Sequence, residues 1–225
     1  MVEVIVFAEG PTEEQFIKRV VAPALRHLQI FLKAQTLRTS QEARGGAVSF
    51  DRLKYNARNT LRGQPEVVLS TFLDLYGLDT SFPGHRDAKR HADLYRKVEH
   101  LESALHASIV EQVQCRPERF IPHIQPHEFE GLLFSDVAAL ASTQPSWGSK
   151  LTALKKVRAA AETPEHINDS FETKPSRRLE DMLLPQYRKT LHGPVAAERI
   201  TLGVMERECV HFRGWLDRLR SLKPS

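Results

Sequence analysis

The sequence predicts an α/β protein in which helices flank a mostly parallel sheet, followed by a C-terminal helical extension. Over the first 125 residues, short runs rich in β-branched residues alternate with amphipathic helical patterns, which is typical of βαβ units joined by crossovers. From Pro126 onward, short helical segments are separated by prolines and no further strand is indicated. We therefore expect an α/β domain over residues 1–135 and a helical extension over 136–225, packed on it or forming a single domain with it.

The first unit is a strand, a tight turn and a helix. Residues 2–8 are rich in β-branched residues and end at Glu9-Gly10-Pro11, which predicts a buried strand that enters a turn. Thr12 and Gln15 match the spacing of a capping box, so a helix is expected directly after the turn. Its buried face is predicted by apolar residues that recur at every fourth position, namely Phe16, Val20, Ala24 and Leu28.

The remaining elements of the α/β part continue this alternation. A continuous apolar run at residues 66–73 predicts a strand that is covered on both faces. Residues 87–113 are expected to form one long helix with an apolar stripe on one side. Further strands are predicted at 30–37 and 120–124, a helix at 50–61, and a polar connection at 38–46.

Composition excludes several classes of protein. The chain has 225 residues, 41% hydrophobic and 27% charged, which suits an ordinary globular core. Its apolar runs are much shorter than the about 20 residues that a membrane-spanning helix needs, and the N-terminus lacks the pattern of a secretory signal. Cys115 and Cys209 are far apart and have no metal-type spacing. A cytoplasmic protein without membrane contact is therefore expected.

The charge is unevenly distributed along the chain. The formal net charge is +4, and residues 150–225 contain 15 Lys and Arg against 10 Asp and Glu. A basic C-terminal part favours the approach of a polyanion such as nucleic acid. An excess of this size is equally well explained as a solubilising surface, and both interpretations stay open.

Acidic side chains follow three of the predicted strands. Glu9 comes directly after the first strand, Asp74 after the third, and Glu128 and Glu130 soon after the fourth. Ligands of parallel α/β sheets gather beyond the carboxyl ends of the strands, and carboxylate oxygens are the ligands that Mg²⁺ prefers. The sequence therefore predicts a Mg²⁺ site, with Mn²⁺ as the alternative ion.

Two details limit this set of acids. On a helix, Glu128 and Glu130 would point about 200° apart and could not both face one metal, whereas in an extended segment they would share a side. Pro126 suits the first turn of a helix, so one of the two glutamates is expected to be a ligand. Glu13, in the first turn of the first helix, is better explained as a favourable charge at a helix N-terminus.

Four features together resemble a known bacterial family. They are the Glu9-Gly10 turn, Asp74 at a strand end, and the blocks 121–134 (IPHIQPHEFEGLLF) and 211–216 (HFRGWL). They are similar to those of the domain-of-unknown-function family DUF4276, which has a Toprim-like fold, and the resemblance spans nearly the whole chain. Toprim domains of topoisomerases, primases and overcoming-lysogenisation-defect nucleases bind Mg²⁺ through a glutamate after their first strand and an Asp-x-Asp after a later one.

The resemblance implies a Mg²⁺-dependent nuclease that hydrolyses phosphodiesters of DNA or RNA. It also implies a separate ABC-type or AAA-type ATPase encoded nearby and a role in anti-phage defence; a homo-oligomer is compatible with the sequence. The alternative function is a catalytically inactive regulatory or sensor subunit of an ATPase complex, and a weaker one is a phosphohydrolase acting on nucleotides. The sequence has no Gly-x-x-x-x-Gly-Lys-Ser/Thr phosphate loop of its own.

The family's metal ligands carry over only in part. Glu9 matches the Toprim glutamate and Asp74 the first acid of Asp-x-Asp, but the sequence reads Asp74-Leu75-Tyr76, so the second acid is missing. Glu128 is therefore expected to complete a metal site with Glu9 and Asp74. Glu130, or Asp79 from the following loop, is the alternative source of that oxygen, and Glu9 or Glu130 is expected to accept a proton from water.

Basic residues of the C-terminal part are candidates for binding the substrate phosphate. They are Arg178, Lys189 and His192, of which Lys189 is also expected to offset charge during catalysis. The alternative is that they stabilise helix ends and meet water. Three histidines, His123, His127 and His211, are interpreted as structural and not as zinc ligands, because the two cysteines, Cys115 and Cys209, do not form the Cys-x-x-Cys pair of a zinc finger.

Overall fold

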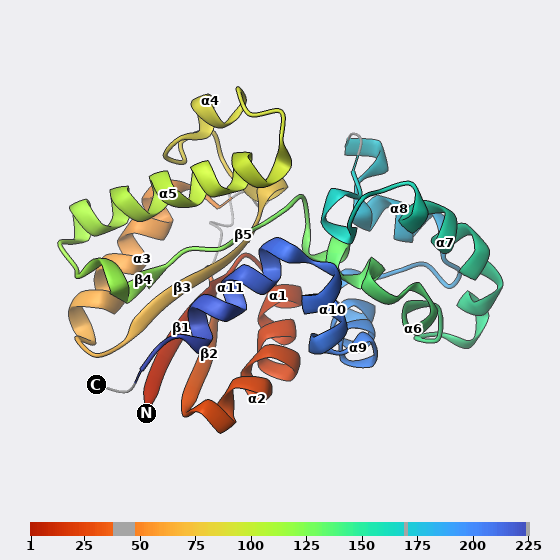
Figure 1. The fold of residues 1–225 in the computed structure, drawn as a ribbon, viewed down its shortest axis with the longest axis horizontal. Coiled ribbons are helices and arrows are strands. Elements are labelled where there is room, and N and C mark those ends of the chain that lie inside the picture. The colour runs from red at the N-terminus through yellow and green to blue at the C-terminus, as the bar shows by residue number, and fades with distance from the viewer. Residues whose placement is uncertain (38–47, 169–170, 224–225) are drawn as a thin grey trace.

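A computed structural model describes residues 1–37, 48–168 and 171–223; the connection predicted at 38–46 lies outside them. The order of the sheet is β2-β1-β3-β4, with β5 also paired with β3, and all pairings among the described strands are parallel. The strands are β1 (Val2–Ala8), β2 (Ile30–Thr36), β3 (Val68–Asp74), β4 (Phe120–Ile121) and β5 (Ile124–Gln125). The predicted α/β class, with a parallel sheet, flanking helices and C-terminal helices, is confirmed (Figure 1).

Both faces of the sheet are covered, which explains the continuous apolar runs. In β1, Val4 and Val6 belong to one hydrophobic cluster, and Ile5 and Phe7 belong to another, because successive side chains of a strand point to opposite faces. Helices α3 (Phe50–Gly63) and α5 (Leu94–Val113) cover the second cluster. The first is covered by α1 (Pro11–Phe16), α2 (Ala22–Leu25), α9 (Lys189–Ile200), α10 (Leu202–Glu208) and α11 (Val210–Arg220).

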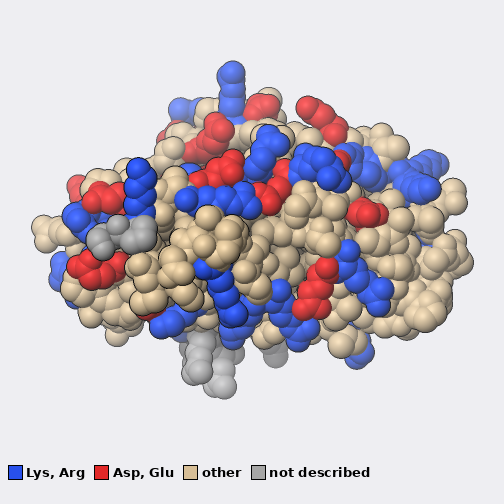
Figure 2. Space-filling model, turned by 60° about the horizontal axis from the view of Figure 1, so that its bottom comes forward, with Lys and Arg blue, Asp and Glu red and all other residues tan. Residues whose placement is uncertain are grey.

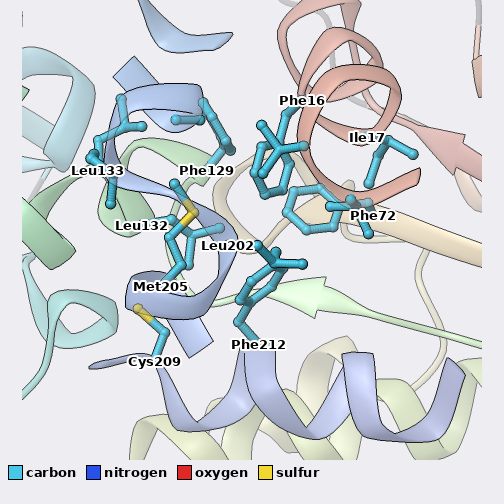
Figure 3. Close-up of a cluster of buried hydrophobic side chains, with 14 of the residues drawn as sticks. Phe16, Ile17, Phe72, Phe129, Leu132, Leu133, Leu202, Met205, Cys209 and Phe212 are labelled. Carbon is cyan, nitrogen blue, oxygen red and sulfur yellow. The ribbon is translucent and has the colours of Figure 1, made fainter. Parts of the chain in front are cut away.

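The C-terminal helices share a hydrophobic core with the sheet. Phe72 of β3 lies between Phe16 of α1 and Phe212 of α11, with ring centroids 5.7 Å and 6.3 Å away. Figure 3 shows these rings beside Phe129 and Met205. The core therefore continues from the α/β part into the C-terminal helices.

Short helices form the rest of the molecule. Within the described residues no strand follows β5, as predicted, and none of the described helices is both long and apolar enough to cross a membrane. The other α-helices are α4 (His85–Ala88), α6 (Val137–Ala141), α7 (Leu151–Ala159) and α8 (Pro175–Met182). The remaining elements are the π-helix η1 (Ile17–Val21) and 3₁₀ segments η2 (Arg26–Leu28), η3 (Leu75–Gly77), η4 (Pro117–Arg119), η5 (Phe129–Asp136), η6 (Pro145–Lys150), η7 (Pro164–His166) and η8 (Phe171–Thr173).

Two predicted helices differ in detail from the structure. After α1, a π-helical turn places more residues in each turn than an α-helix does. As a result Leu25 is buried, whereas Leu28, which was expected on the buried face, is 38% exposed. The helix predicted at 87–113 is two helices, α4 and α5, because Asp93 caps a new start by accepting a hydrogen bond from the N–H of Arg96 at 2.8 Å.

The strand predicted at 120–124 is interrupted between β4 and β5. Pro122 has no N–H to donate to a sheet ladder, and β3 compensates with side chains. Ser70 Oγ donates to the Ile121 carbonyl at 2.6 Å. Thr71 Oγ1 accepts from the His123 N–H at 2.9 Å and donates to the His123 carbonyl at 3.0 Å.

Candidate metal centre

Parallel strands bring the predicted acids to one edge of the sheet. Ala8 of β1 pairs with Phe72 of β3, so Glu9 and Asp74 leave the sheet at the same end. Asp74 in turn pairs with Gln125 of β5. The chain then turns at His127, whose φ is 57° and whose carbonyl accepts from the Tyr76 N–H at 3.1 Å. This turn brings the segment after β5 back over the end of β3.

Three buried carboxylates meet at this edge. One oxygen each from Asp74, Glu128 and Glu130 lies within 4.8 Å of the other two, and none of the three residues is more than 6% exposed. Burial and then Glu9 raise the pKa of Asp74 well above its ordinary value, and burial raises the pKa of Glu130 to about 7. Carboxylates this close and this dry need a cation or protons to coexist.

Protein donors orient these carboxylates. The Phe129 N–H donates to Asp74 Oδ1 at 2.8 Å, the Ser176 N–H donates to Glu128 Oε2 at 3.0 Å, and the Tyr187 hydroxyl donates to Glu130 Oε1 at 3.2 Å. Hydrogen bonds of this kind fix the direction of a ligating carboxylate. The donor set consists of oxygen atoms, so the residues present fit a hard divalent cation such as Mg²⁺ or Mn²⁺.

Both glutamates of the Glu-Phe-Glu segment point into the centre. The expectation that only one of them is a ligand depends on both being helical. Glu128 is extended, with φ −147° and ψ 155°, and η5 begins one residue later. The helical phase therefore does not separate Glu128 from Glu130, and the structure groups both with Asp74.

Glu9 lies behind the group of three. Its Oε2 accepts a hydrogen bond from the Asp74 N–H at 3.1 Å, which fixes the start of the turn after β3. Burial and then Glu13 raise the pKa of Glu9 to about 7. The predicted metal ligands were Glu9, Asp74 and Glu128. In the structure Glu130, and not Glu9, lies with Asp74 and Glu128. Glu9 instead supports Asp74 through the hydrogen bond from its N–H. Asp79 accepts from the Ser81 N–H at 2.8 Å in the following loop.

Gly77 provides the space that Glu9 occupies, and its replacement is expected to disturb the centre. A Cβ atom on Gly77 would lie 2.2 Å from Glu9 Oε2. In Gly77→Ala the carboxylate must move and give up the Asp74 N–H, so the free energy of unfolding should fall by about 1–3 kcal/mol, as in other overpacked sites. Denaturant titration measures this, with Gly203→Ala as the control because nothing lies within 4 Å of that position. Equal effects of the two changes would contradict this role of Gly77.

Glu13 interacts with the N-terminus of α1, as expected, but it is buried and also belongs to the acidic centre. It is 6% exposed, and its Oε2 accepts from the Gly10 N–H at 3.0 Å, so the N-terminal cap of α1 uses Gly10 and Glu13 and not the expected Thr12 and Gln15. Burial raises the pKa of Glu13. Its position four residues after Glu9, in the helical turn that follows the strand, is the sequence signal that could have identified it.

Two lysines neutralise part of this negative charge. Lys189 Nζ lies 3.2 Å from Glu128 Oε1 and 3.3 Å from Glu130 Oε2, and Lys174 Nζ lies 2.9 Å from Glu128 Oε1. Burial opposes the charge on Lys189, but Glu130 and Glu128 raise its pKa. Burial likewise opposes ionisation of Glu128, while Lys189 and Lys174 hold its pKa below the ordinary value. Five acids, Glu9, Glu13, Asp74, Glu128 and Glu130, therefore converge near two lysines.

Arg178 and His192, the other two candidates for binding the substrate phosphate, make their described contacts outside the acidic centre. Arg178 of α8 donates through Nε to the Thr173 carbonyl. His192 of α9 is buried, accepts from the Arg188 N–H at 2.9 Å and packs edge-on to Trp147 at 4.8 Å. Among the described residues, neither side chain has a hydrogen bond or ion pair with the five acids. The structure thus brings only Lys189 of the three basic candidates to the centre, together with Lys174, which sequence reasoning missed.

Comparison with known proteins gives one result. A family model described as "Domain of unknown function (DUF4276)" matches residues 8–220. No curated protein and no solved structure matches the chain. The matched range includes every acidic and basic residue of the centre, from Glu9 to Lys189.

Proposed function

The chain belongs to the DUF4276 family, and within that family we propose that it is a Toprim-type nuclease, which hydrolyses phosphodiesters of DNA or RNA with Mg²⁺ or Mn²⁺. The observation that carries the proposal is the convergence of Asp74, Glu128 and Glu130 within 4.8 Å. The Toprim-like assignment is supported by the neighbouring positions of β1 and β3, because Glu9 follows the first strand and Asp74 ends the second of this pair.

The roles of the residues follow from their contacts. Asp74, Glu128 and Glu130 would hold the cation, and Glu9 would keep Asp74 in place. A bound Mg²⁺ would polarise the phosphate and lower the pKa of an attacking water. Lys189, whose side chain is 36% exposed, reaches from the carboxylates to solvent and would offset charge on a phosphate oxygen. Glu9, with a pKa raised to about 7 by burial and Glu13, suits proton acceptance near neutral pH.

A separate ABC-type or AAA-type ATPase and a role in anti-phage defence belong to the same proposal. They are supported by the family resemblance; because the sequence has no phosphate-binding loop, ATP hydrolysis would fall to the partner. Figure 2 shows that Lys and Arg side chains are spread over one face among fewer acidic ones. Such a face supports non-specific contacts with a nucleic-acid backbone.

Cleavage assays test the proposal directly. The purified chain, alone and with the ATPase encoded beside it, is incubated with single- and double-stranded DNA and RNA. Products are expected with Mg²⁺ or Mn²⁺ and not after chelation by EDTA, because the acids cannot polarise a phosphate without the ion. Cleavage that persists in EDTA, or that is undiminished in Glu130→Gln, would contradict the assignment.

A regulatory or sensor subunit of the ATPase is the second candidate. It is favoured by two observations: Tyr76 stands where the second acid of Asp-x-Asp would be, and Lys174 and Lys189 already pair with Glu128. An acidic cluster neutralised by lysines can hold a fold together without any ion. The two candidates differ in whether divalent ions bind.

Metal-dependent stability at two pH values separates these candidates. Burial raises the pKa values of Glu9 and Glu130 to about 7 in the folded chain, against 4.5 for the ordinary group. A raised carboxyl pKa stabilises the fold below the unfolded value and loses that effect as pH rises through the folded value. The Tm without metal should therefore fall between pH 5.5 and pH 8. If the protein is a nuclease, Mg²⁺ should raise the Tm, and by more at pH 8 than at pH 5.5. The absence of a Mg²⁺ effect at both pH values favours the regulatory subunit.

A further inference from the structure

A second group of metal-ligating side chains lies at the β4–β5 edge of the sheet. Glu102 comes from α5, His123 from the break between β4 and β5, and His211 from the first turn of α11. One ligand atom from each lies within 4.8 Å of the other two. Helices α5 and α11 run on either side of this edge (Figure 1). None of these three residues belongs to the acidic centre described above.

The nitrogen atoms of His123 are unequally satisfied. Its Nε2 lies 3.2 Å from Gln125 Oε1, so the tautomer with its hydrogen on Nε2 can donate to that amide oxygen. The Nδ1 atom then presents a lone pair. It is buried without a hydrogen-bond partner among the described residues and lies 3.5 Å from Glu102 Oε1. In this tautomer a lone pair faces a carboxylate oxygen in a dry site, and either a metal cation or a proton between the two atoms makes the arrangement favourable.

Glu102 and His211 complete the set of donors. His211 Nε2 lies 2.9 Å from the same oxygen, Glu102 Oε1. The Glu102 carboxylate is fixed by the Ile124 N–H, which donates to Oε1 at 2.8 Å, and by Arg218, which donates to Oε2 at 3.2 Å. Ligating histidines usually donate their other N–H to an oxygen, and ligating carboxylates are hydrogen-bonded in turn. His123 with Gln125, and Glu102 with Arg218, match this pattern.

The cluster has access to solvent through a cavity. A cavity of about 930 Å³ is lined by residues of α5, β4 and α11, and both Glu102 and His211 reach its wall. Tyr95, Trp215 and Arg218 line it as well. His123, which is fully buried, lies behind this wall. An ion bound by the three side chains would therefore face the cavity, and water or a small ligand could occupy its remaining coordination positions.

We propose that Glu102, His123 and His211 form a second metal site, which binds a borderline transition-metal ion of the Zn²⁺ class. Two imidazoles with one carboxylate are a donor set typical of open zinc sites, whereas Mg²⁺ prefers oxygen ligands only. The two sites of the molecule thus differ in chemistry. The three ligands are separated by 21 and 88 positions in the sequence, so they form no short sequence motif from which a metal site could be predicted.

Titration with Zn²⁺ alone tests this site. The full chain is treated with a chelator, transferred into buffer containing excess Mg²⁺, and titrated with Zn²⁺ by calorimetry. One equivalent is expected to bind to the wild type. Loss of an outer-shell partner typically weakens a metal site roughly 10- to 100-fold, and Glu102→Gln and His211→Ala, which remove ligands, should weaken binding by more than that. Circular dichroism verifies that each variant is folded.

Two controls separate this site from its surroundings and from the acidic centre. His106→Ala removes a histidine that lines the same cavity but lies outside the cluster, and Asp74→Asn changes only the acidic centre. Both are expected to bind Zn²⁺ like the wild type. Zinc binding that survives Glu102→Gln, or that is lost in Asp74→Asn, overturns the proposal.

Cobalt provides a measurement on the unmodified protein, which is decisive if the variants do not fold. Co²⁺ bound to two imidazoles and a carboxylate in an open site gives strong visible absorption because its coordination number is low. Such a spectrum, displaced by one equivalent of Zn²⁺, is the expected result. A weak spectrum of a six-coordinate ion with oxygen ligands, unchanged by Zn²⁺, overturns the proposal.

Discussion

Asp74→Asn is expected to reduce divalent-ion binding and nucleic-acid cleavage by about 100-fold or more, because it removes a charged ligand at the centre of the proposed site. The variant should nevertheless fold. Asparagine keeps a side-chain oxygen that can accept from the Phe129 N–H, as Asp74 Oδ1 does at 2.8 Å. Burial and Glu9 raise the pKa of Asp74, so the ionised group destabilises the metal-free fold at high pH.

Stability and activity should consequently move in opposite directions in this variant. At pH 8 and without metal, the free energy of unfolding of Asp74→Asn should equal or exceed that of the wild type, as measured by denaturant titration. The matched control is Asp87→Asn, since Asp87 is exposed and pairs only with Arg90 at 3.1 Å among the described contacts. Full cleavage by Asp74→Asn, or an equal loss in Asp87→Asn, would remove Asp74 from the proposed metal site.

Phe72→Ala should produce the largest loss of stability, about 3–5 kcal/mol in the free energy of unfolding. Phe72 is fully buried and lies within 5.7 Å of the rings of Phe16, His123 and Trp215. Removing it opens a cavity where β3 meets the first and last helices, and those neighbours come from elements that cannot all collapse into it.

Tyr55→Ala is the control for this substitution, because Tyr55 is an aromatic residue of α3 that is 67% exposed. Surface changes of this kind usually alter stability by less than about 0.5 kcal/mol. Chemical denaturation followed by far-ultraviolet circular dichroism gives both values. A loss below about 1 kcal/mol in Phe72→Ala would show that the core tolerates the cavity and that the C-terminal helices do not depend on this ring.

Much of the fold could be predicted because each layer leaves a local signal. The runs that became β1 and β3 are continuous and apolar, since helices cover both of their faces, and their ends agree with the structure within two residues. The π-helical turn at Ile17–Val21 leaves no such signal. With this turn, Leu25 is buried in place of Leu28. The break at Pro122 has a local cause, because proline cannot donate to the sheet ladder.

Only the residues of the candidate site that directly follow strands could be predicted from the sequence. Glu9 and Asp74 could be placed together because parallel neighbours finish at one edge. The convergence of Glu128 and Glu130 with Asp74 depends on the left-handed backbone of His127 (φ 57°), which is uncommon for a residue other than glycine. Lys174 and Tyr187 reach the centre through the tertiary fold of the C-terminal helices. The sequence around them gives no indication of their partners.

The contact between Trp215 and β3 has a consequence for how the protein forms during synthesis. Trp215 Nε1 donates to Ser70 Oγ at 2.9 Å across 145 positions of sequence, and α10 and α11 cover the sheet face that contains Val4 and Val6. Until residues 202–219 have emerged from the ribosome, only α1, α2 and α9 can cover this face, so part of its apolar surface stays exposed. Such surfaces are prone to association, and α10 and α11 remove this one when they close over the sheet.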